Sequence, residues 1–234
     1  MRKLTGVCFL TAILLGSSAY AQSLFIERGD PSTMSLTLGG MLGNTLGPSG
    51  TVEASYSYRG VFDVGLEFGA LDYKSGRNDN LRSLDFAPFF NWHLLRSEED
   101  ELPVSLSLLV AVEKVLYYDN GAYASPNGWG VLAGGTIYRR IELGSSVLFI
   151  PEVLIAYDFM YTRYYSNAQD QKAQSVGGNS AVNGYSTTAS NSARGVLYLN
   201  VGFKGGQHIY TISPYGGYEG SLGSLGGVLL GFVF

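Results

Sequence analysis

Bulky apolar residues alternate with small or polar residues along much of this chain. In residues 61–73 the apolar positions and the intervening small or acidic positions are Phe62, Val64, Leu66, Phe68 and Ala70 against Asp63, Gly65, Glu67 and Gly69. A period of two puts the two sets on opposite faces of a β-strand, whereas a helix would mix the carboxylates with the phenylalanines. The segment is therefore predicted to be a strand with one uncharged apolar face.

The same alternation recurs often enough to predict the whole architecture. Clear examples cover 84–94, 104–112, 149–157, 197–203 and 226–234, and weaker ones cover 35–42, 51–58, 129–138 and 208–218. Together with 61–73 they predict ten strands, with eight as the alternative count. We find no credible helix between them and no second domain.

The apolar face of these strands is bulky and nearly free of charge, while the other face carries Gly, Ser, Ala, Asn and scattered charges. A soluble barrel would point its apolar face inward and show Lys and Glu outside. Here the reverse arrangement fits, with apolar side chains against lipid and polar ones inside. Because an unpaired strand edge in hydrocarbon costs several kcal/mol per group, the sheet must close. We predict an all-β fold, a closed antiparallel up-and-down transmembrane β-barrel.

The chain ends in GGVLLGFVF, an apolar strand with no polar tail after Phe234. Closure explains this ending, because the last strand would pair with the first inside the membrane wall. With the N-terminus on the periplasmic side, the longest connection falls outside and the two shortest fall inside, as outer-membrane barrels prefer. An even strand count returns Phe234 to the periplasmic interface.

The first 21 residues have the pattern of an export signal. A basic start at Arg2 and Lys3 precedes an apolar stretch over 4–15, and Ala19 and Ala21 form a small-x-small cleavage site. We predict a signal peptide over residues 1–21 and a barrel domain over 22–234. Cys8 is the single cysteine of the chain, so the processed chain would contain neither disulfides nor thiolate metal sites.

Charged residues on the second face define a candidate lumen network. The positions assigned to the lumen or its rims are Glu53, Arg59, Asp63, Glu67, Asp85, Glu113, Glu152 and Lys204. Charges in so confined a space should pair and hydrogen-bond. If they fill a narrow lumen, the protein is a closed structural barrel. If water threads between them, the excess of carboxylates predicts a small cation-preferring pore. We favour the filled lumen, because about ten strands is near the size that side chains fill.

Catalytic and cofactor signatures were sought without success. A barrel-type lipid-modifying enzyme would need a His beside a Ser near the outer rim, whereas His93 and His208 fall near periplasmic turns. No metal-ligand spacing or phosphate-binding glycine motif is present. We expect a non-enzymatic protein without a cofactor, and His93 is expected to be an interior hydrogen-bonding residue. The chain carries 15 basic against 19 acidic residues, which argues against a nucleic-acid partner.

The longest predicted connection, residues 160–192, is polar and rich in Ser, Asn, Gln and Gly. Such a composition buries too little apolar surface to order itself, and long loops are often functional. We hypothesise a surface contact element for an extracellular ligand, against the alternative of a hydrophilic cover.

In its leader, alternating strands and terminal aromatic strand, the chain resembles the small outer-membrane β-barrel proteins, the superfamily of porin-like and OmpA-like barrels. The resemblance implies insertion into the outer-membrane lipid of Gram-negative bacteria and exposure at the cell surface. It also implies recognition by the barrel-assembly machinery through the last strand, at Val228, Leu230, Phe232 and Phe234.

Overall fold

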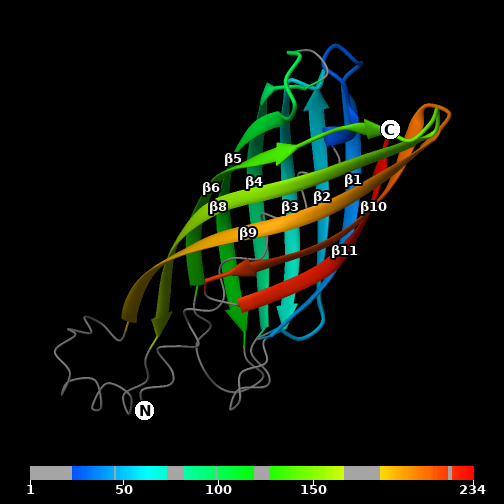
Figure 1. Cartoon of the computed structure of the whole chain (residues 1–234). Coiled ribbons are helices and arrows are strands. Elements are labelled where there is room, and N and C mark those ends of the chain that lie inside the picture. The colour runs from blue at the N-terminus through cyan, green and yellow to red at the C-terminus, as the bar shows by residue number, and fades with distance from the viewer. Residues whose placement is uncertain are drawn as a thin grey trace.

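The computed structural model describes residues 23–44, 46–72, 82–97, 100–118, 127–165, 185–220 and 223–234. Apart from one short 3-10 turn, η2 (Ser23–Phe25), the described elements are β-strands (Figure 1). The long strands are β1 (Thr33–Gly43), β2 (Ser49–Tyr58), β3 (Phe62–Asp72), β4 (Arg82–Leu95), β5 (Ser105–Tyr118), β6 (Asn127–Tyr138), β8 (Val147–Tyr165), β9 (Tyr185–Gly205), β10 (His208–Glu219) and β11 (Gly223–Val233). A two-residue strand, β7 (Ile141–Glu142), pairs only with the start of β8.

The ten long strands form a closed antiparallel ring. Each pairs with its neighbours in sequence, β6 pairs with β8, and β1 pairs with β11 over Ser35↔Val233 to Gly43↔Leu225. At the seam, the backbones of Met34 and Phe234 exchange two hydrogen bonds of 2.9 Å. The predictions of ten strands, of antiparallel closure and of a closing C-terminal strand are therefore confirmed.

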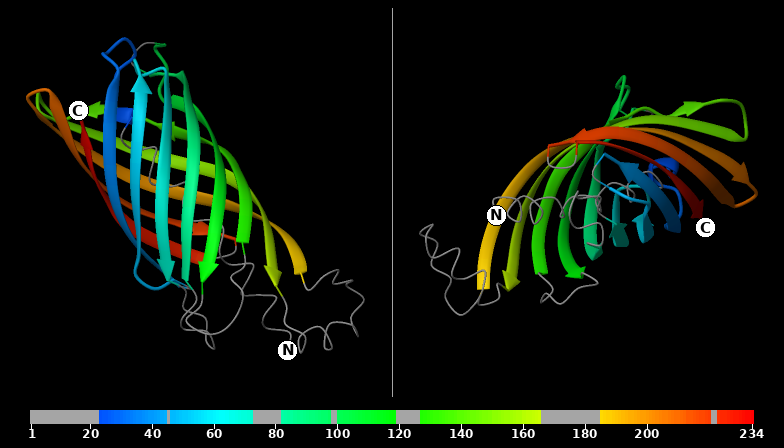
Figure 2. Two further views of the ribbon diagram at one scale, coloured as in Figure 1. Left: turned by 180° about the vertical axis from the view of Figure 1, so that it is seen from behind. Right: turned by 90° about the horizontal axis from the view of Figure 1, so that it is seen from below.

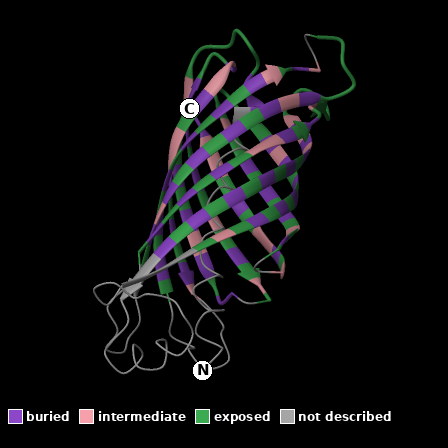
Figure 3. Ribbon diagram, turned by 90° about the vertical axis from the view of Figure 1, so that its left-hand side faces the viewer, coloured by how far each residue is buried: buried purple, intermediate pink, exposed green. Residues whose placement is uncertain are grey.

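The two faces of the barrel wall are inverted relative to a soluble protein. Buried and exposed residues alternate along the strands (Figure 3), and bulky apolar side chains lie on the outer surface. They include Val64, Phe68, Phe86, Phe90, Leu108, Val110, Val153, Ile155, Leu197, Leu199, Val228 and Leu230. A strand of about 11 residues, rising roughly 3.3 Å per residue and tilted by about 45°, covers about 25 Å, the height of a lipid-facing apolar band. The exterior is thus suited to lipid.

We call the end of the barrel where β1 begins and β11 ends the proximal end. In the β2–β3 connection, Arg59 and Gly60 both have positive φ, and the amide of Val61 bonds the carbonyl of Tyr58 at 2.9 Å. Consecutive positive φ values are typical of hairpin turns whose twist matches that of the strands. Pairing resumes at Tyr58↔Phe62, so this connection comprises residues 59–61.

Strands β8 and β9 run far past the distal ends of their neighbours (Figure 2). Their pairing continues from Met160↔Ser190 to Tyr165↔Tyr185, inside the stretch predicted as a loop over 160–192. That prediction was wrong at both ends, because the outer face continues through Phe159 and Tyr161 on β8 and through the smaller residues Asn191 and Ala189 on β9. The remainder, 166–184, lies outside the described residues, as does the predicted signal peptide over 1–21.

In the described part of the chain, no helix has the length and apolar character needed to cross a membrane.

Candidate functional site

The interior of the barrel holds six of the eight charged residues predicted for the lumen. Glu53, Asp63, Glu67, Asp85, Glu113 and Glu152 all face inward and are at most 5% exposed. They come from β2, β3, β4, β5 and β8, so they line most of the ring. Glu53 lies directly opposite Glu67 in the β2–β3 register, which places two carboxylates side by side.

The two predicted cations lie at the rim, which the prediction included. Arg59 occupies the exposed β2–β3 turn, and Lys204 is exposed near the end of β9. The Lys204 ammonium lies 3.7 Å from a carboxylate oxygen of Glu142, outside the lumen. Both residues therefore belong to the proximal rim and do not neutralise the interior acids.

Two charged residues missed at the sequence level complete the central part of the lumen. Arg194 on β9 and Asp158 on β8 are buried, and both interact electrostatically with Glu113. Arg194 also lies opposite Glu219 in the β9–β10 register. Since the carboxylates of Asp85 and Glu67 act on Glu113 as well, one guanidinium faces several acids.

The signal for this pair was present in the sequence. Residues 153–161 keep their alternation beyond the predicted end of the strand at residue 157, which assigns Asp158 to the inner face. The same extension of β9 before Leu197 places Arg194 inside.

A second polar group lies nearer the proximal end. The His93 Nε2 is 2.7 Å from the Asp63 carboxylate, and the His93 Nδ1 is 3.2 Å from the Tyr138 hydroxyl. Asn91 donates to the same Asp63 oxygen at 3.2 Å. Farther around the wall, Asn200 donates to Glu152 at 3.1 Å. His93 is therefore an interior hydrogen-bonding residue, as predicted.

The polar groups share the lumen with an apolar cluster that the sequence did not predict. Its inward-facing members come from every long strand except β2: Met41, Leu71, Phe89, Leu109, Ala111, Leu132, Leu154, Ala156, Val196, Tyr198, Tyr215, Leu225 and Leu229, together with Leu46 from the β1–β2 connection. All are less than 10% exposed. These residues were not predicted because the sequence pattern is dominated by the apolar outer face. Single apolar side chains at inner-face positions look like exceptions to a polar face.

The proximal mouth is covered by residues 23–30, which we call the N-terminal strap. Leu24, Phe25 and Ile26 are at most 3% exposed, and Leu24 and Phe25 form a cluster with Tyr138, Leu148 and Ile150. Figure 1 shows η2 in dark blue within this end of the barrel. Residues 23–30 carry no strand pattern, so the sequence alone assigns no role to this short apolar stretch.

The chemistry available in the described residues is limited. Within them, no group of three or more His, Cys, Asp or Glu side chains could hold a metal ion. His208 is the first residue of β10, beside the proximal turn, and its ring centroid lies 5.1 Å from that of Phe232. Neither histidine lies at the distal rim, where the sequence argument required one for a lipid-modifying enzyme.

The assembly residues lie on the last strand as expected from its pattern. Val228, Leu230 and Phe234 are exposed on the outer face, and the Phe232 ring stacks 5.4 Å from that of Phe234. Their recognition by an assembly machinery stays a prediction.

Comparison with known proteins finds no matching family model and no matching curated protein. Among solved structures, the chain is similar to Ail, the attachment invasion locus protein of Yersinia pestis, with 9% identity over 87% of this chain and 97% of that one and a TM-score of 0.35. It is also similar to a loop-deletion mutant of OmpT, an outer membrane protein of Vibrio cholerae, with 9% identity over 87% and 97% of the two chains and a TM-score of 0.20. The ring closure and the inverted faces described above give this chain the architecture of an outer-membrane β-barrel.

Proposed function

We propose that this protein is a closed, non-conducting structural barrel of the outer membrane that presents the β8–β9 hairpin at the cell surface. The observation that carries this proposal is the apolar cluster inside the lumen. Non-enzymatic action and export through a cleaved signal peptide are parts of the same proposal.

An apolar layer across a lumen resists ion passage. Hydrophobic constrictions exclude water, and an ion that crosses them loses its hydration without gaining polar partners. Here side chains such as Phe89, Leu109 and Leu154 project from different strands into one cluster. The acids of the central lumen would attract cations, but they share the interior with this layer. The interior acids favour the cation-pore alternative, whereas the apolar layer opposes it and supports the closed barrel.

Planar-bilayer recording tests the proposal. The folded wild-type barrel is expected to give no steady current steps in KCl. The matched control is the triple variant Phe89→Ala, Leu109→Ala and Leu154→Ala, which thins the apolar layer and should raise the frequency of conducting events. Steady cation-selective steps from the wild type would overturn the closed-barrel proposal and establish the pore.

The surface role rests on the length of the β8–β9 hairpin. These strands have 19 and 21 residues, whereas the other long strands have 10 to 14. Along β9 the outer face changes from Leu199 and Leu197 to Ala193, Asn191 and Ala189, so it loses its lipid-facing character before the hairpin ends.

An epitope tag inserted after residue 175 tests this presentation. Antibody is expected to label intact cells as strongly as permeabilised ones, while a tag inserted between Gly144 and Ser145 should require permeabilisation. Labelling of intact cells through the second tag alone would reverse the proposed orientation.

An unchanged lipid A mass profile on expression would accord with non-enzymatic action, and a changed one would contradict it.

A further inference from the structure

The N-terminal strap crosses the proximal mouth and touches elements from opposite sides of the ring. The amide of Gly29 bonds the carbonyl of Arg59 in the β2–β3 turn at 3.0 Å. Arg28 donates to the carbonyl of His93 on β4 at 3.3 Å. At its other end, Phe25 packs beside β8, and Gly202 of β9 leaves room for the ring. The strap therefore spans the opening instead of following one wall.

The apolar part of the strap fits a cavity whose walls belong to the barrel. A Cβ added to Gly202 would come within 2.5 Å of the Phe25 ring, so a side chain there would displace it. The neighbouring walls are Tyr138, Leu148 and Ile150, which are themselves almost fully buried. These residues sit on rigid strands and would keep their places without the strap.

Polar side chains of the barrel hold the backbone of the strap. Arg96, at 2% exposure, donates to the carbonyls of Ile26 at 2.5 Å and Gly60 at 2.7 Å. Arg140 donates to the carbonyl of Phe25 at 3.5 Å and pairs with Glu27 at 2.6 Å. Guanidinium groups that donate to main-chain carbonyls, next to a cavity that accepts an aromatic ring, are features of a peptide-binding site.

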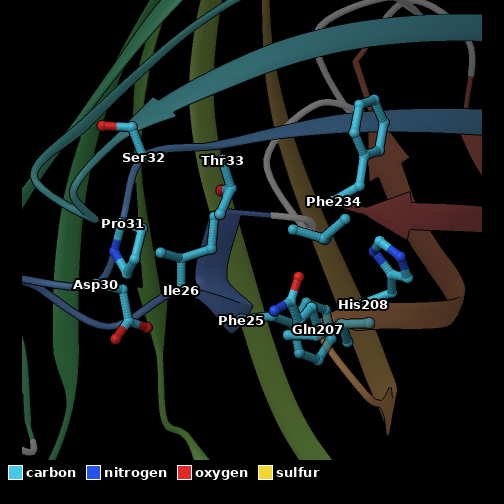
Figure 4. A pocket seen from close by; sticks show the side chains of 11 residues that line it. Phe25, Ile26, Asp30, Pro31, Ser32, Thr33, Gln207, His208 and Phe234 are labelled. Atoms are coloured by element: carbon cyan, nitrogen blue, oxygen red, sulfur yellow. The ribbon is translucent and has the colours of Figure 1, made fainter.

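One flank of the strap is not packed against the wall. A pocket of about 490 Å³ separates Phe25, Ile26 and Asp30 from His208 and Phe234 (Figure 4). The strap is therefore anchored on one side and open on the other. A segment held in this way can leave without any strand of the ring coming apart.

We propose that the proximal mouth is a binding site for a short peptide with an apolar–aromatic–apolar sequence, and that residues 23–28 of this chain occupy it in cis. When the strap is in place, it closes the mouth and covers the Asp63–His93–Tyr138 group. When it is displaced, the same arginines and cavity can receive another segment of this chemistry. This inference goes beyond the closed-barrel proposal, since it concerns the mouth and not the conductance of the lumen.

A thiol reporter inside the mouth tests the site in a chain whose other thiol is removed by Cys8→Ser. Ser107→Cys places a thiol at a fully buried position beside His93 in the β4–β5 register. In detergent-folded protein, this thiol is expected to react slowly with a charged maleimide. Phe25→Asp should free the strap and accelerate labelling at least about tenfold. The acetylated peptide SLFIER, added in excess, should slow the labelling of that variant again, whereas SLSIER should not.

Controls separate the possible outcomes. Leu102→Asp adds the same charge to an exposed apolar site on the β4–β5 connection and should leave labelling slow. If Phe25→Asp fails to fold, Arg140→Gln is the milder variant, because it removes the Glu27 ion pair and a carbonyl contact. Unchanged slow labelling in a folded strap variant overturns the closure, and acceleration that SLFIER cannot reverse overturns the peptide site. Fast labelling with the strap unaltered would also overturn the closure, because the strap would then not shield the mouth.

Discussion

At the scale of single residues, the lumen is unusual in placing acids beside acids. Glu53 and Glu67 lie directly opposite each other in the β2–β3 register, and both are 1% exposed. Like charges at such positions destabilise a strand pair, and buried charges also lose hydration. Arg194 relieves part of this repulsion around Glu113, on another part of the wall. Some interior carboxylates, such as this pair, are therefore expected to destabilise the folded barrel.

Glu53→Gln is therefore expected to stabilise the barrel. The amide keeps the shape of the side chain but removes one of the two opposed charges, which should add about 1 kcal/mol to the free energy of unfolding. Urea unfolding in detergent or lipid vesicles, in alkaline buffer that keeps the opposed carboxylates ionised, measures the change. Glu101→Gln, at an exposed position, should leave the midpoint unchanged. A clear loss of stability in Glu53→Gln would show that the carboxylate has a favourable partner.

Arg96 is a residue on which the strap and the wall both depend. Its replacement by Met keeps much of the aliphatic volume but leaves the carbonyls of Ile26 and Gly60 without their donor. Losing two buried hydrogen bonds to a charged group should cost about 2–4 kcal/mol in the free energy of unfolding. The same urea titration serves as the measurement, with Arg139→Met at an exposed position as the control. Equal midpoints for the two variants would contradict this assignment.

At the scale of elements, the strands were predictable because their alternation is set by one uniform environment. Lipid outside demands an apolar side chain at every second position, as in residues 61–73, and the ten strands and their closure followed from that pattern. The extra length of β8 and β9 did not follow from that pattern. Beyond the lipid, the outer face can carry residues such as Ala189 and Asn191, and a strand of such residues resembles a loop in sequence. Short non-repeating segments such as the strap carry no period at all.

The energetic cost of an outward-facing charge depends on its depth in the membrane. Leu230, opposite both Leu38 and Ile212, lies within the length of β11 and is 55% exposed on the outer face. Leu230→Arg should therefore cost about 2–4 kcal/mol in lipid vesicles, as at the midplane of other barrels. Tyr58→Arg, at the proximal end of β2, should cost about 0–1 kcal/mol. Similar costs at the two positions, measured by urea unfolding in vesicles, would argue against a lipid-facing exterior.

At the scale of the whole molecule, the lumen could be predicted only in part from the sequence. The six interior acids could be assigned to the lumen because they alternate with the outward-facing apolar residues of their strands. The same alternation predicts that the apolar face points outward. The apolar cluster around Phe89 and Leu154 required knowing which residues meet across the ring. Contacts between strands that are distant in sequence have no local signature, and the same holds for the contacts between Arg96 and the strap.

Ring closure itself has a measurable consequence. Ten strands, each paired on both sides, leave no edge at which unfolding by detergent can begin. The folded protein should therefore stay compact in cold SDS and migrate differently from the boiled chain on a gel. Removing the closing strand tests the cause. A chain ending at Gly220 cannot pair β1 with β11, so it should migrate identically before and after boiling. A heat-dependent shift that survives this truncation would mean that the compact species does not depend on the β1–β11 seam.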